Sequence, residues 1–464
     1  MTDKSLLITI GHGLVSRNLL RNRFLPEVLV NAHLKLIIVT PAATDPEFTE
    51  EFGHERIRFV DMPECPTRAR RESLINALHA ATVFNGTSHI KFLYRIQHKK
   101  SVWLNYWARK LSANLVGRSR LLRRFIAWLD TTLLPDQSYG AILDEHKPDV
   151  VFATSVVTRH EGDLLKAAKK RNIPTIGMVK SWDNLVKDLP LRIVPDELVV
   201  WNEIMKQQAM HTQLIPEQQL SVVGIPQFDI YNQTMAEPSQ RDAFMQSIGA
   251  DPAKKLLVFA SEGKWSPGDP QIVQLITQFI ENGQLAQNCH LHVRPHFCWG
   301  KFLPPLFALE KHGVVSVDKT WNETAYFPDG WDPDWKDMTH LANSMRYADV
   351  VITSPSTIAL DAAYFDTPVI NIGFDGDGEA AHDRTVRWLY ETEYYKSVMK
   401  FDATTLVSGS EELRDAIGIY LDNPAHKRSE RDRLRNAFAY RMDGQAGTRL
   451  AERILGFLKK HSKS

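Results

Sequence analysis

The stretch DVVITSPSTIALDAAYFDTPVINIGF (residues 349–374) decides the fold that the sequence predicts. Its two ends, DVVITS and PVINIGF, are typical of buried strands, and the alanine-rich segment between them is typical of a helix that packs closely on a sheet. Pro355 suits the first turn of that helix, because proline lacks the N–H that would be unpaired there. The stretch therefore predicts a βαβ unit within a parallel sheet.

Strand-like and helix-like segments alternate in the same way along the rest of the chain. A polar segment near residues 232–243 separates two groups of short β-branched runs: SLLITI, LKLIIV, RIRFV, DVVFATS, TIGMV, ELVVW and LSVVGI before it, and KLLVFA, CHLHV, GVVSV, DVVITS and PVINIGF after it. This alternation predicts an α/β protein with two tandem Rossmann-like domains facing each other across a cleft. We expect the first domain over residues 1–235 and the second, with the C-terminal helices, over residues 250–464.

The composition limits the classes of partner and the compartment. The 464 residues carry 56 Lys and Arg against 55 Asp and Glu, so no overall positive field favours nucleic acid. Three cysteines scattered along the sequence are typical of a reducing compartment. The apolar run at the N-terminus is too short for a signal peptide, and no stretch approaches the roughly 18 apolar residues of a membrane span. These features predict a cytoplasmic protein.

A basic segment rich in aromatic residues lies at about residues 92–136, inside the first domain. It carries no acid between Lys99 and Arg124, and its cations include Lys99, Lys100, Arg123 and Arg124. Such a segment can form an amphipathic helix that lies on the inner face of the plasma membrane or binds an anionic acceptor. The alternative is a helical insert that packs on the sheet and exposes a solvated basic face.

Ligands of doubly wound sheets lie beyond the carboxyl ends of the strands, so the residues after each strand are the first candidates. After DVVITS, Ser354 and Ser356 are candidate caps of a helix whose free amides favour a phosphate. Thr357 and Asp361 lie one helical turn apart, where Asp361 is a candidate acceptor for sugar hydroxyls. An ordinary capped helix is the alternative.

The segment CHLHVRPHF (residues 289–297) holds several potential metal ligands. Strand periodicity separates them, because His290, His292 and Arg294 share one face and Cys289 belongs to the other. We therefore expect no metal site here. Arg294 and His296, at the end of the strand, are candidate ligands for a donor phosphate.

Near the N-terminus, ITIGHG resembles a dinucleotide-binding turn only in part. Ser16 stands where the third glycine of that fingerprint would be, and the next strand ends without an acid for a ribose. We therefore expect no nicotinamide cofactor, and no cofactor of another kind. His12 in this turn is a candidate general base, although a turn histidine without a role is the alternative.

Two further strand ends carry polar side chains. SWDN follows TIGMV and offers Trp182, Asp183 and Asn184 to an acceptor, with Asp183 as a second candidate base; Asp and Asn are also simply common in turns. ASEGKW follows KLLVFA and offers Glu262 and Lys264 to a donor, because a lysine there can neutralise a leaving phosphate.

The segment KTWNETAYFPDGWDPDWKDM (residues 319–338) combines aromatic rings with acidic residues. A flap that stacks on a base or sugar is one interpretation. A rigid Pro-Gly loop that packs over the edge of a domain is the other.

Taken together, these segments resemble the GT-B superfamily of glycosyltransferases, and more closely the bacterial surface-carbohydrate proteins related to CDP-glycerol glycerophosphotransferases. The resemblance covers about residues 150–440, through SWDN, PDELVVWNEIMKQQA, SVVGIPQFDIY, HVRPH, DMTHLANSMRYADVVITSPSTIALDAAYFDTPVINIGFDG and YETEYYKSV. Residues 1–140 match only as a generic Rossmann-like domain. One departure is Tyr394, which stands where relatives often have histidine.

The resemblance implies a metal-independent glycosyltransferase that moves a sugar or polyol phosphate from an activated phosphate donor to a growing surface polysaccharide. It implies a donor in the second domain, near Arg294, His296, Ser356, Thr357 and Asp361, and a saccharide acceptor, free or lipid-linked, on the first. Three other interpretations stay open: a sugar-nucleotide epimerase of the same shape, a transferase that uses phosphoribosyl diphosphate, and an inactive binding partner in polysaccharide assembly.

Overall fold

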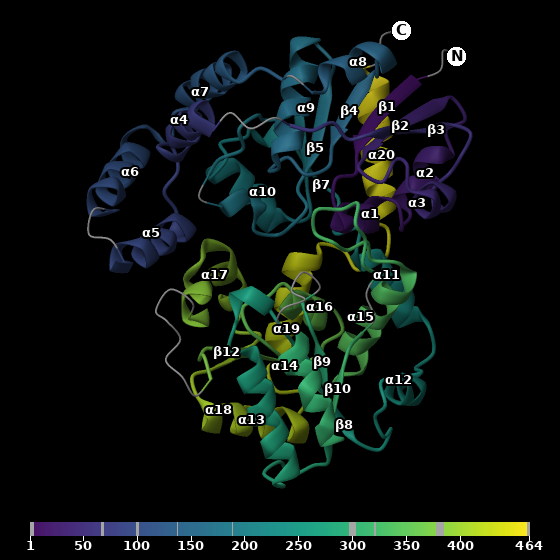
Figure 1. Cartoon of the computed structure of the whole chain (residues 1–464), viewed down its shortest axis with the longest axis vertical. Coiled ribbons are helices and arrows are strands. Elements are labelled where there is room, and N and C mark those ends of the chain that lie inside the picture. Colours follow the sequence, from purple (N-terminus) through teal and green to yellow (C-terminus); the bar gives the residue numbers. More distant parts are fainter. Residues whose placement is uncertain are drawn as a thin grey trace. The chain divides into compact units, whose positions relative to one another are not determined.

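The computed structural model describes residues 4–65, 69–98, 102–136, 138–187, 189–296, 303–319, 322–376 and 385–461. These residues form two compact units (Figure 1). The first unit comprises Met1–Asp229, Glu323–Asp332 and Tyr440–Ser464, and the second comprises Ile230–Asn322 and Pro333–Ala439. The chain passes from the first unit to the second inside helix α11 (Phe228–Ala236).

The first unit is built on a parallel sheet of seven strands within the described residues. In spatial order they are β3 (Ile57–Asp61), β2 (Leu34–Thr40), β1 (Lys4–Thr9), β4 (Val150–Ala153), β5 (Thr175–Met178), β6 (Glu197–Val200) and β7 (Leu220–Val222). Its helices are α1 (Gly13–Leu19), α2 (Phe24–Leu29), α3 (Pro46–Glu51), α4 (Ala69–Ala80), α5 (Gly86–His98), α6 (Val102–Val116), α7 (Arg120–Leu133), α8 (Gly140–His146), α9 (Arg159–Lys170), α10 (Glu203–His211) and α20 (Ala446–His461), with short 3-10 turns η1 (Asn184–Val186) and η2 (Glu217–Gln219).

The second unit has a parallel sheet of six described strands. In spatial order they are β10 (Val315–Val317), β9 (Cys289–Arg294), β8 (Lys255–Ala260), β11 (Val350–Thr353), β12 (Val369–Ile372) and β13 (Thr405–Val407). Its helices are α12 (Arg241–Ser247), α13 (Asp269–Glu281), α14 (Leu303–Phe307), α15 (Trp335–Tyr347), α16 (Ile358–Tyr364), α17 (Glu393–Met399), α18 (Ser410–Asp422) and α19 (Arg428–Ala439), with 3-10 turns η3 (Gly263–Trp265), η5 (Ala308–His312) and η6 (Val386–Glu391).

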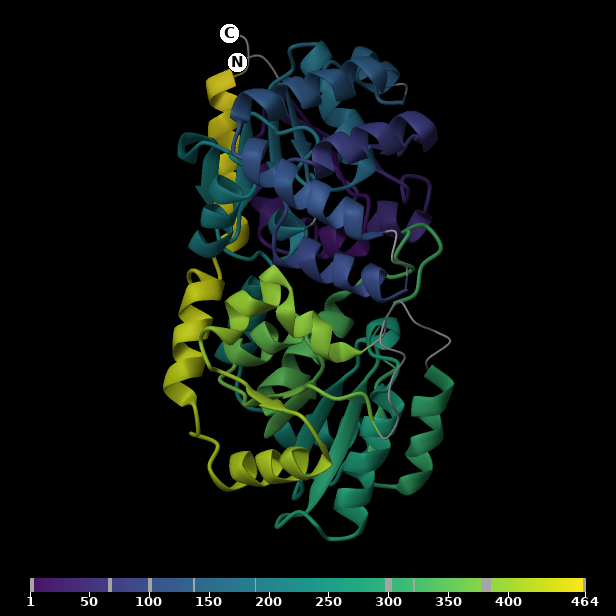
Figure 2. The ribbon, with the colours of Figure 1, turned by 90° about the vertical axis from the view of Figure 1, so that its left-hand side faces the viewer.

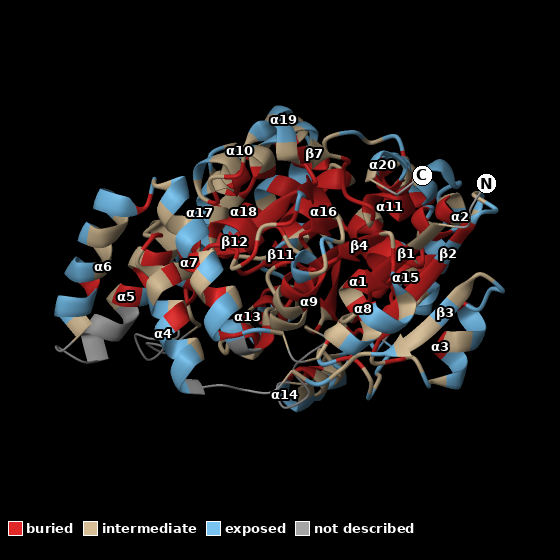
Figure 3. Ribbon diagram, turned by 90° about the horizontal axis from the view of Figure 1, so that it is seen from above, coloured by how far each residue is buried: buried red, intermediate tan, exposed pale blue. Residues whose placement is uncertain are grey.

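Each sheet is buried on both faces, which explains why its strands are continuously apolar. In the first sheet Leu6 and Ile8 pack in one core cluster, while Leu7 between them packs in another with residues of α8 and α9. The second sheet alternates in the same way, because Leu257 and Leu256 belong to different clusters on its two faces. The central strands β4 and β11 are accordingly buried in Figure 3, whereas the edge strand β3 is intermediate or exposed. The predicted α/β class with two Rossmann-like units is confirmed.

The C-terminal helix α20 lies in the first unit, whereas the sequence analysis placed residues up to 464 in the second domain. The helix turns Leu450, Ile454 and Phe457 onto the cluster that contains Leu6, and it packs beside α2. Figures 1 and 2 show it as the yellow helix within that unit. The expected boundary is wrong here because the apolar stripe of α20 has its partner on the first sheet.

The aromatic segment Glu323–Asp332 also belongs to the first unit, although its neighbours in the chain belong to the second. It folds back on itself through a bridge between Glu323 and Trp331. Tyr326 and Phe327 then pack edge-on against Phe48 of α3, with ring centroids 5.9 and 6.1 Å away. Of the two interpretations of this segment, the structure favours the packed loop, since Phe327 is 3% exposed.

Five helices of the described residues, α4 to α8, lie between β3 and β4 in the first unit, and the first four of them form the helical insert (Figure 1). The helical insert therefore begins near residue 69, earlier than the expected 92. Among the helices that the structure describes, none is both long and apolar enough to cross a membrane.

Candidate functional site

Apart from the additional edge strand β7 of the first sheet, the described strands of both sheets have the same order, and each sheet has one point where that order reverses. The chain runs from β1 outward to β2 and β3 and then returns to β4; in the second unit it runs from β8 to β9 and β10 and returns to β11. Ligands of open α/β sheets bind beyond the carboxyl ends of the strands at such a point. The segments after β1 and β4, and those after β8 and β11, are therefore the candidate sites.

In the second unit, Asp269 organises the segment that follows β8. This buried carboxylate accepts hydrogen bonds from Ser261 Oγ at 2.6 Å, from the backbone N–H of Glu262 at 2.9 Å, and from Ser266 Oγ. Ser266 Oγ in turn lies 2.9 Å from Ser354 Oγ, at the end of β11. The hydroxyls of Ser261, Ser266 and Ser354 thus join the two strand ends through one carboxylate. Burial raises the pKa of Asp269 to about 6 despite these hydrogen bonds.

Glu262 lies beside this network with an unusual protonation state. Burial raises the pKa of its carboxyl to about 8, the charge of Asp269 adds to the rise, and a hydrogen bond with Ser356 partly opposes it. The carboxyl is therefore largely protonated at neutral pH. A neutral acid at this position does not repel an anionic ligand and can donate a hydrogen bond to it.

The raised pKa of Glu262 predicts a specific dependence of stability on pH. The folded-state pKa (about 8) exceeds the ordinary value of 4.5. The contribution of this carboxyl to the free energy of unfolding is therefore fully present below pH 4.5 and is lost as pH rises through 8. Glu262→Gln cannot ionise, so we expect it to be more stable than the wild type at pH 9 by at least about 1.4 kcal/mol, the equivalent of one pKa unit, but not at pH 5. Thermal unfolding at both pH values measures this difference.

Glu237→Gln is the matched control, since Glu237 is an exposed carboxylate of the same unit. This control should shift both melting temperatures equally. A Glu262→Gln effect of the same size at pH 5 and pH 9 would contradict the assigned protonation.

The predicted residues after β11 are only partly open. Ser354 is fully buried, while Ser356 accepts a hydrogen bond from the backbone N–H of Ile358 at 3.2 Å. The helix α16 begins at Ile358, so Thr357 is its N-cap and is exposed. Asp361 is 7% exposed and accepts a hydrogen bond from the Tyr231 hydroxyl at 2.9 Å. Thr357 and Ser356 are therefore the more accessible members of this group.

Arg294, at the end of β9, is held between two acids. Its guanidinium donates hydrogen bonds to Asp318 and, at 2.6 Å, to Asp337 of α15. These two carboxylates outweigh the effect of burial and raise the pKa of Arg294. Its charge is largely compensated within the protein, so a phosphate would have to compete with them. His296 follows the same strand and is partly buried.

One group of described residues has the chemistry of a metal site. The ligand atoms of His292, Asp318 and His340 lie within 4.8 Å of one another. His292 Nδ1 lies 2.9 Å from Ser316 Oγ, and burial lowers the pKa of His292 to about 3, so its ring is neutral. The guanidinium of Arg294 already binds Asp318 and places a positive charge beside this group, which disfavours a divalent cation.

In the first unit, Glu161 is the buried acid at the reversal point. Thr9, the last residue of β1, donates a hydrogen bond from Oγ1 to Glu161 Oε1 at 2.6 Å, and Thr154 Oγ1 lies 3.4 Å from the same oxygen. Burial raises the pKa of Glu161 to about 7 against these hydrogen bonds. The acid therefore links the ends of β1 and β4 and is close to half-protonated at neutral pH.

His12 follows β1 and lies directly before α1. Burial, together with the charges of Lys180 and His160, lowers its pKa to about 4, so the imidazole is neutral and able to accept a proton at neutral pH. The aromatic segment lies beside it, because Gly13 donates its backbone N–H to Asp329 Oδ1 at 3.4 Å. A side chain at Gly13 would overlap the carbonyl oxygen of Trp331, 1.8 Å from the position of a Cβ.

In the SWDN turn the structure separates the predicted residues. Trp182 packs edge-on against Trp201 with ring centroids 5.0 Å apart, and Asn184 accepts backbone hydrogen bonds from Lys180 and Ser181. Both are buried and order the turn, which corrects the expectation that they face an acceptor. Asp183 is the exposed member, with a side chain 43% exposed and 3.5 Å from Lys187 Nζ.

The candidate cations of the insert also differ in their exposure and in whether they bind other parts of the protein. Arg123 donates hydrogen bonds to the carbonyls of Thr212 at 2.6 Å and Thr82 at 3.1 Å, so it anchors α7 rather than facing a ligand. Arg124, the next residue, is exposed. Lys99, Lys100 and the side chain of Lys264 lie outside the described residues.

Sequence reasoning missed Glu161, Lys180, Asp269 and Asp329. Glu161 could have been found by applying the strand-end rule to DVVFATS, after which TRHE opens a helix. Asp269 lies at the start of α13, where an acid is expected for the helix dipole alone, and Asp329 accepts the backbone N–H of Gly13 only because the loop folds back on the first unit. The sequence gives no sign of these last two roles.

Comparison with known proteins links the chain to others by fold only. No model of a known protein family matches the chain, and no curated protein matches it in sequence. Among solved structures, a protein of Listeria monocytogenes assigned as a UDP-N-acetylglucosamine 2-epimerase matches with a TM-score of 0.58 and 12% identity, over 99% of this chain and 98% of that one.

Two further structures have the same architecture. The UDP-GlcNAc 2-epimerase of Neisseria meningitidis, solved with bound UDP-GlcNAc, has a TM-score of 0.53 and 10% identity over 97% of this chain and 99% of that one. The wall teichoic acid polymerase TagF has a TM-score of 0.50 and 10% identity over 99% of this chain and 89% of that one. The fold is of the GT-B type. At these identities the likeness establishes the GT-B fold and leaves the activity to be argued from the site.

Proposed function

We propose that this GT-B protein is a transferase that moves a sugar or a polyol phosphate from a nucleotide-activated donor to a growing bacterial surface polysaccharide, without a metal ion. The observation that carries the proposal is the group at the reversal point of the second sheet. There, Asp269 fixes the ends of β8 and β11, and the protonated Glu262 lies beside Ser356. Neutral donors at a strand edge of this kind suit the diphosphate of a nucleotide.

The comparisons support a nucleotide as the donor group. The Neisseria epimerase binds UDP-GlcNAc, and the same fold serves a teichoic acid polymerase. In our proposal Glu262, Ser356 and Thr357 contact the donor, while His296 and Lys264 stabilise charge that develops on the leaving phosphate. Arg294 positions Asp318 and Asp337 more than it binds phosphate, since both acids already pair with it.

The acceptor side of the proposal rests on the first unit. His12 is neutral and follows β1 at the reversal point, which suits a general base for an acceptor hydroxyl. Asp183 is the second candidate base, because it is the exposed acid of the SWDN turn. The acceptor that we propose is a saccharide, free or attached to a lipid.

A panel of nucleotides tests the donor class. Only a ligand that binds the native state raises the melting temperature, and at 100 times its dissociation constant the gain is about 2.7 kcal/mol. We expect CDP or UDP to raise the melting temperature by several degrees in a panel that also contains GDP, CMP, ADP and phosphoribosyl diphosphate. Stabilisation by phosphoribosyl diphosphate alone would contradict the nucleotide donor.

An epimerase is the second candidate, because the two epimerases described above match the chain with higher TM-scores than TagF. An epimerase needs no acceptor. Incubation with UDP-GlcNAc in deuterium oxide, followed by NMR, separates the two functions: isomerisation with uptake of solvent deuterium and no acceptor favours the epimerase. Turnover that requires an added saccharide favours the transferase. Turnover of either kind excludes an inactive binding partner.

A further inference from the structure

The exposed large apolar side chains of the described residues are concentrated on two helices of the insert. On α6 the exposed positions follow helical spacing along one face: Trp103, Leu104, Trp107, Leu111 and Leu115, with exposed fractions from 48% to 79%. On α7 the corresponding face carries Leu121, Phe125 and Trp128, from 52% to 79% exposed. We call these eight side chains the outer face. Elsewhere, exposed apolar residues such as Val30 and Ile419 occur singly, which is normal for a protein surface.

The opposite faces of the same helices are fixed to the first unit. Arg109 Nε and Ser112 Oγ of α6 donate to the carbonyls of Ala80 at 2.8 Å and Ala81 at 2.9 Å, and Arg123 of α7 donates to that of Thr82 at 3.1 Å. Both helices therefore pack on the turn that follows α4. The sides of α6 and α7 opposite the outer face are therefore the ones that hold these helices to the first unit.

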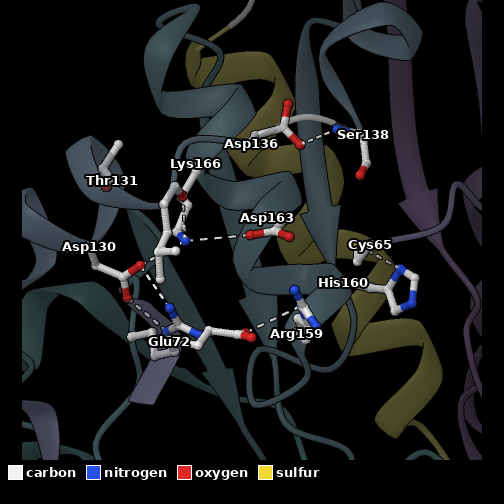
Figure 4. Close-up of polar contacts among 12 residues, drawn as sticks. Cys65, Glu72, Asp130, Thr131, Asp136, Ser138, Arg159, His160, Asp163 and Lys166 are labelled. Atoms are coloured by element: carbon white, nitrogen blue, oxygen red, sulfur yellow. Dashed lines mark hydrogen bonds and ion pairs between the residues drawn. The ribbon is translucent and has the colours of Figure 1, made fainter. Parts of the chain in front are cut away.

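A buried charge cluster holds α7 and α4 to the rest of the first unit (Figure 4). Asp130 of α7, fully buried, pairs with Lys166 of α9 at 2.7 Å, with Arg192 at 2.7 Å and with His79 of α4 at 3.2 Å. Glu72 of α4 pairs with Arg159 at 3.4 Å. Burial would raise the pKa of Asp130, but His79, Arg192 and Lys166 together lower it. This cluster anchors α4 and α7 to the rest of the first unit.

The charge around the outer face has one sign. No Asp or Glu occurs in the sequence between Glu72 and Asp130. Arg118, Arg120 and Arg124 are exposed, and within the described part of the chain no carboxylate forms an ion pair with them. Lys110 Nζ lies 5.0 Å from the centroid of the Trp107 ring. Figure 3 shows exposed and intermediate residues along α6 and α7.

We propose that the outer face docks on the surface of an anionic phospholipid bilayer. Tryptophan, leucine and phenylalanine beside arginine and lysine are the composition of helices that lie in the interface of a membrane. The rings and leucines enter the boundary of the acyl chains, and the arginines contact lipid phosphates. The contact is peripheral, and it is independent of the proposed transferase activity because it involves none of the donor or base residues.

Vesicle co-sedimentation of the full-length protein tests the proposal. We expect binding to vesicles of phosphatidylglycerol and phosphatidylcholine in a 1:1 ratio, and at least ten-fold weaker binding to pure phosphatidylcholine. Each cation near an anionic surface contributes about a five-fold change in affinity, so Arg120→Gln with Arg124→Gln should weaken binding by about 25-fold. Trp107→Ser with Leu111→Ser should weaken it more than ten-fold.

Val30→Ser and Ile419→Ser are the matched controls, since both residues are exposed and lie outside the insert; neither should change binding. The arginine variants also keep the test valid if the serine variants fold poorly, as these exposed arginines have no ion pair in the described structure. Equal binding of all variants would overturn the proposal. A concentration-dependent dimer in sedimentation velocity without vesicles, lost in Trp107→Ser with Leu111→Ser, would also overturn it in favour of a second copy of the chain.

Discussion

Replacement of His12 by glutamine is expected to lower turnover by 10²- to 10⁴-fold while the melting temperature changes by no more than about 1 °C. Removal of a general base typically has an effect of that size on rate. Stability should change little, because the His12 side chain makes no capping hydrogen bond to α1 and its backbone carbonyl, which accepts from Val15 and Ser16, is retained in the variant. Initial rates with a saturating nucleotide donor and a saccharide acceptor measure the loss.

The pH profile distinguishes a base from a structural residue. The pKa of His12, lowered to about 4 by burial, Lys180 and His160, predicts that kcat/KM stays constant above about pH 5 and falls below pH 4, when the ring becomes protonated. The fall in kcat reports the same group in the complex with substrate. His211→Gln, at an exposed histidine of α10, is the control and should behave as the wild type. A His12→Gln enzyme within three-fold of wild-type turnover would remove His12 from the reaction and leave Asp183 as the candidate.

The fold could be predicted because its cause is local. A strand buried on both faces must be continuously apolar, and a helix that packs on it must present small or apolar residues. DVVITS and PVINIGF could therefore be assigned as strands, and ALDAA as part of a helix, from their own residues alone. The order of the strands then places the ends of β1, β4, β8 and β11 at the reversal points. That is why the strand-end rule selected His12, Glu262 and Ser356, which follow β1, β8 and β11 in the structure.

The remaining features could not be predicted because their causes are distant in sequence. Whether the apolar stripe of α20 packs in the first or the second unit depends on which unit has an uncovered apolar surface. The sequence of residues 446–461 does not contain that information. The same holds for Arg123 and Arg124, adjacent cations on different sides of α7: one reaches the Thr82 carbonyl and the other is exposed. The aromatic residues of segment 323–332 are evident from the sequence. The arginine that binds this segment is not, because it lies 311 residues before the last residue of the segment.

That arginine is Arg21, and its replacement by methionine is expected to lower the stability of the first unit by about 3–5 kcal/mol. Arg21 follows α1 and binds Asp332 through both terminal nitrogens, at 2.6 and 3.0 Å, with the two side chains 3% and 0% exposed. Methionine keeps the volume of the stem but leaves the Asp332 carboxylate buried without its cation, beside the Tyr326 hydroxyl that donates to it at 3.0 Å. A shift in melting temperature on the order of 10 °C follows for a unit of this size.

Two comparisons separate the buried pair from an ordinary surface ion pair. Arg21 also binds Glu51, whose side chain is 39% exposed, so Glu51→Gln should cost no more than about 1 kcal/mol. Arg21→Met combined with Asp332→Met removes both charges and should recover most of the stability, because the cost comes from burying one charge without the other. A cost below 1 kcal/mol for Arg21→Met at pH 7, or no recovery in the double variant, would mean that aromatic packing on Phe48 alone holds the segment beside His12.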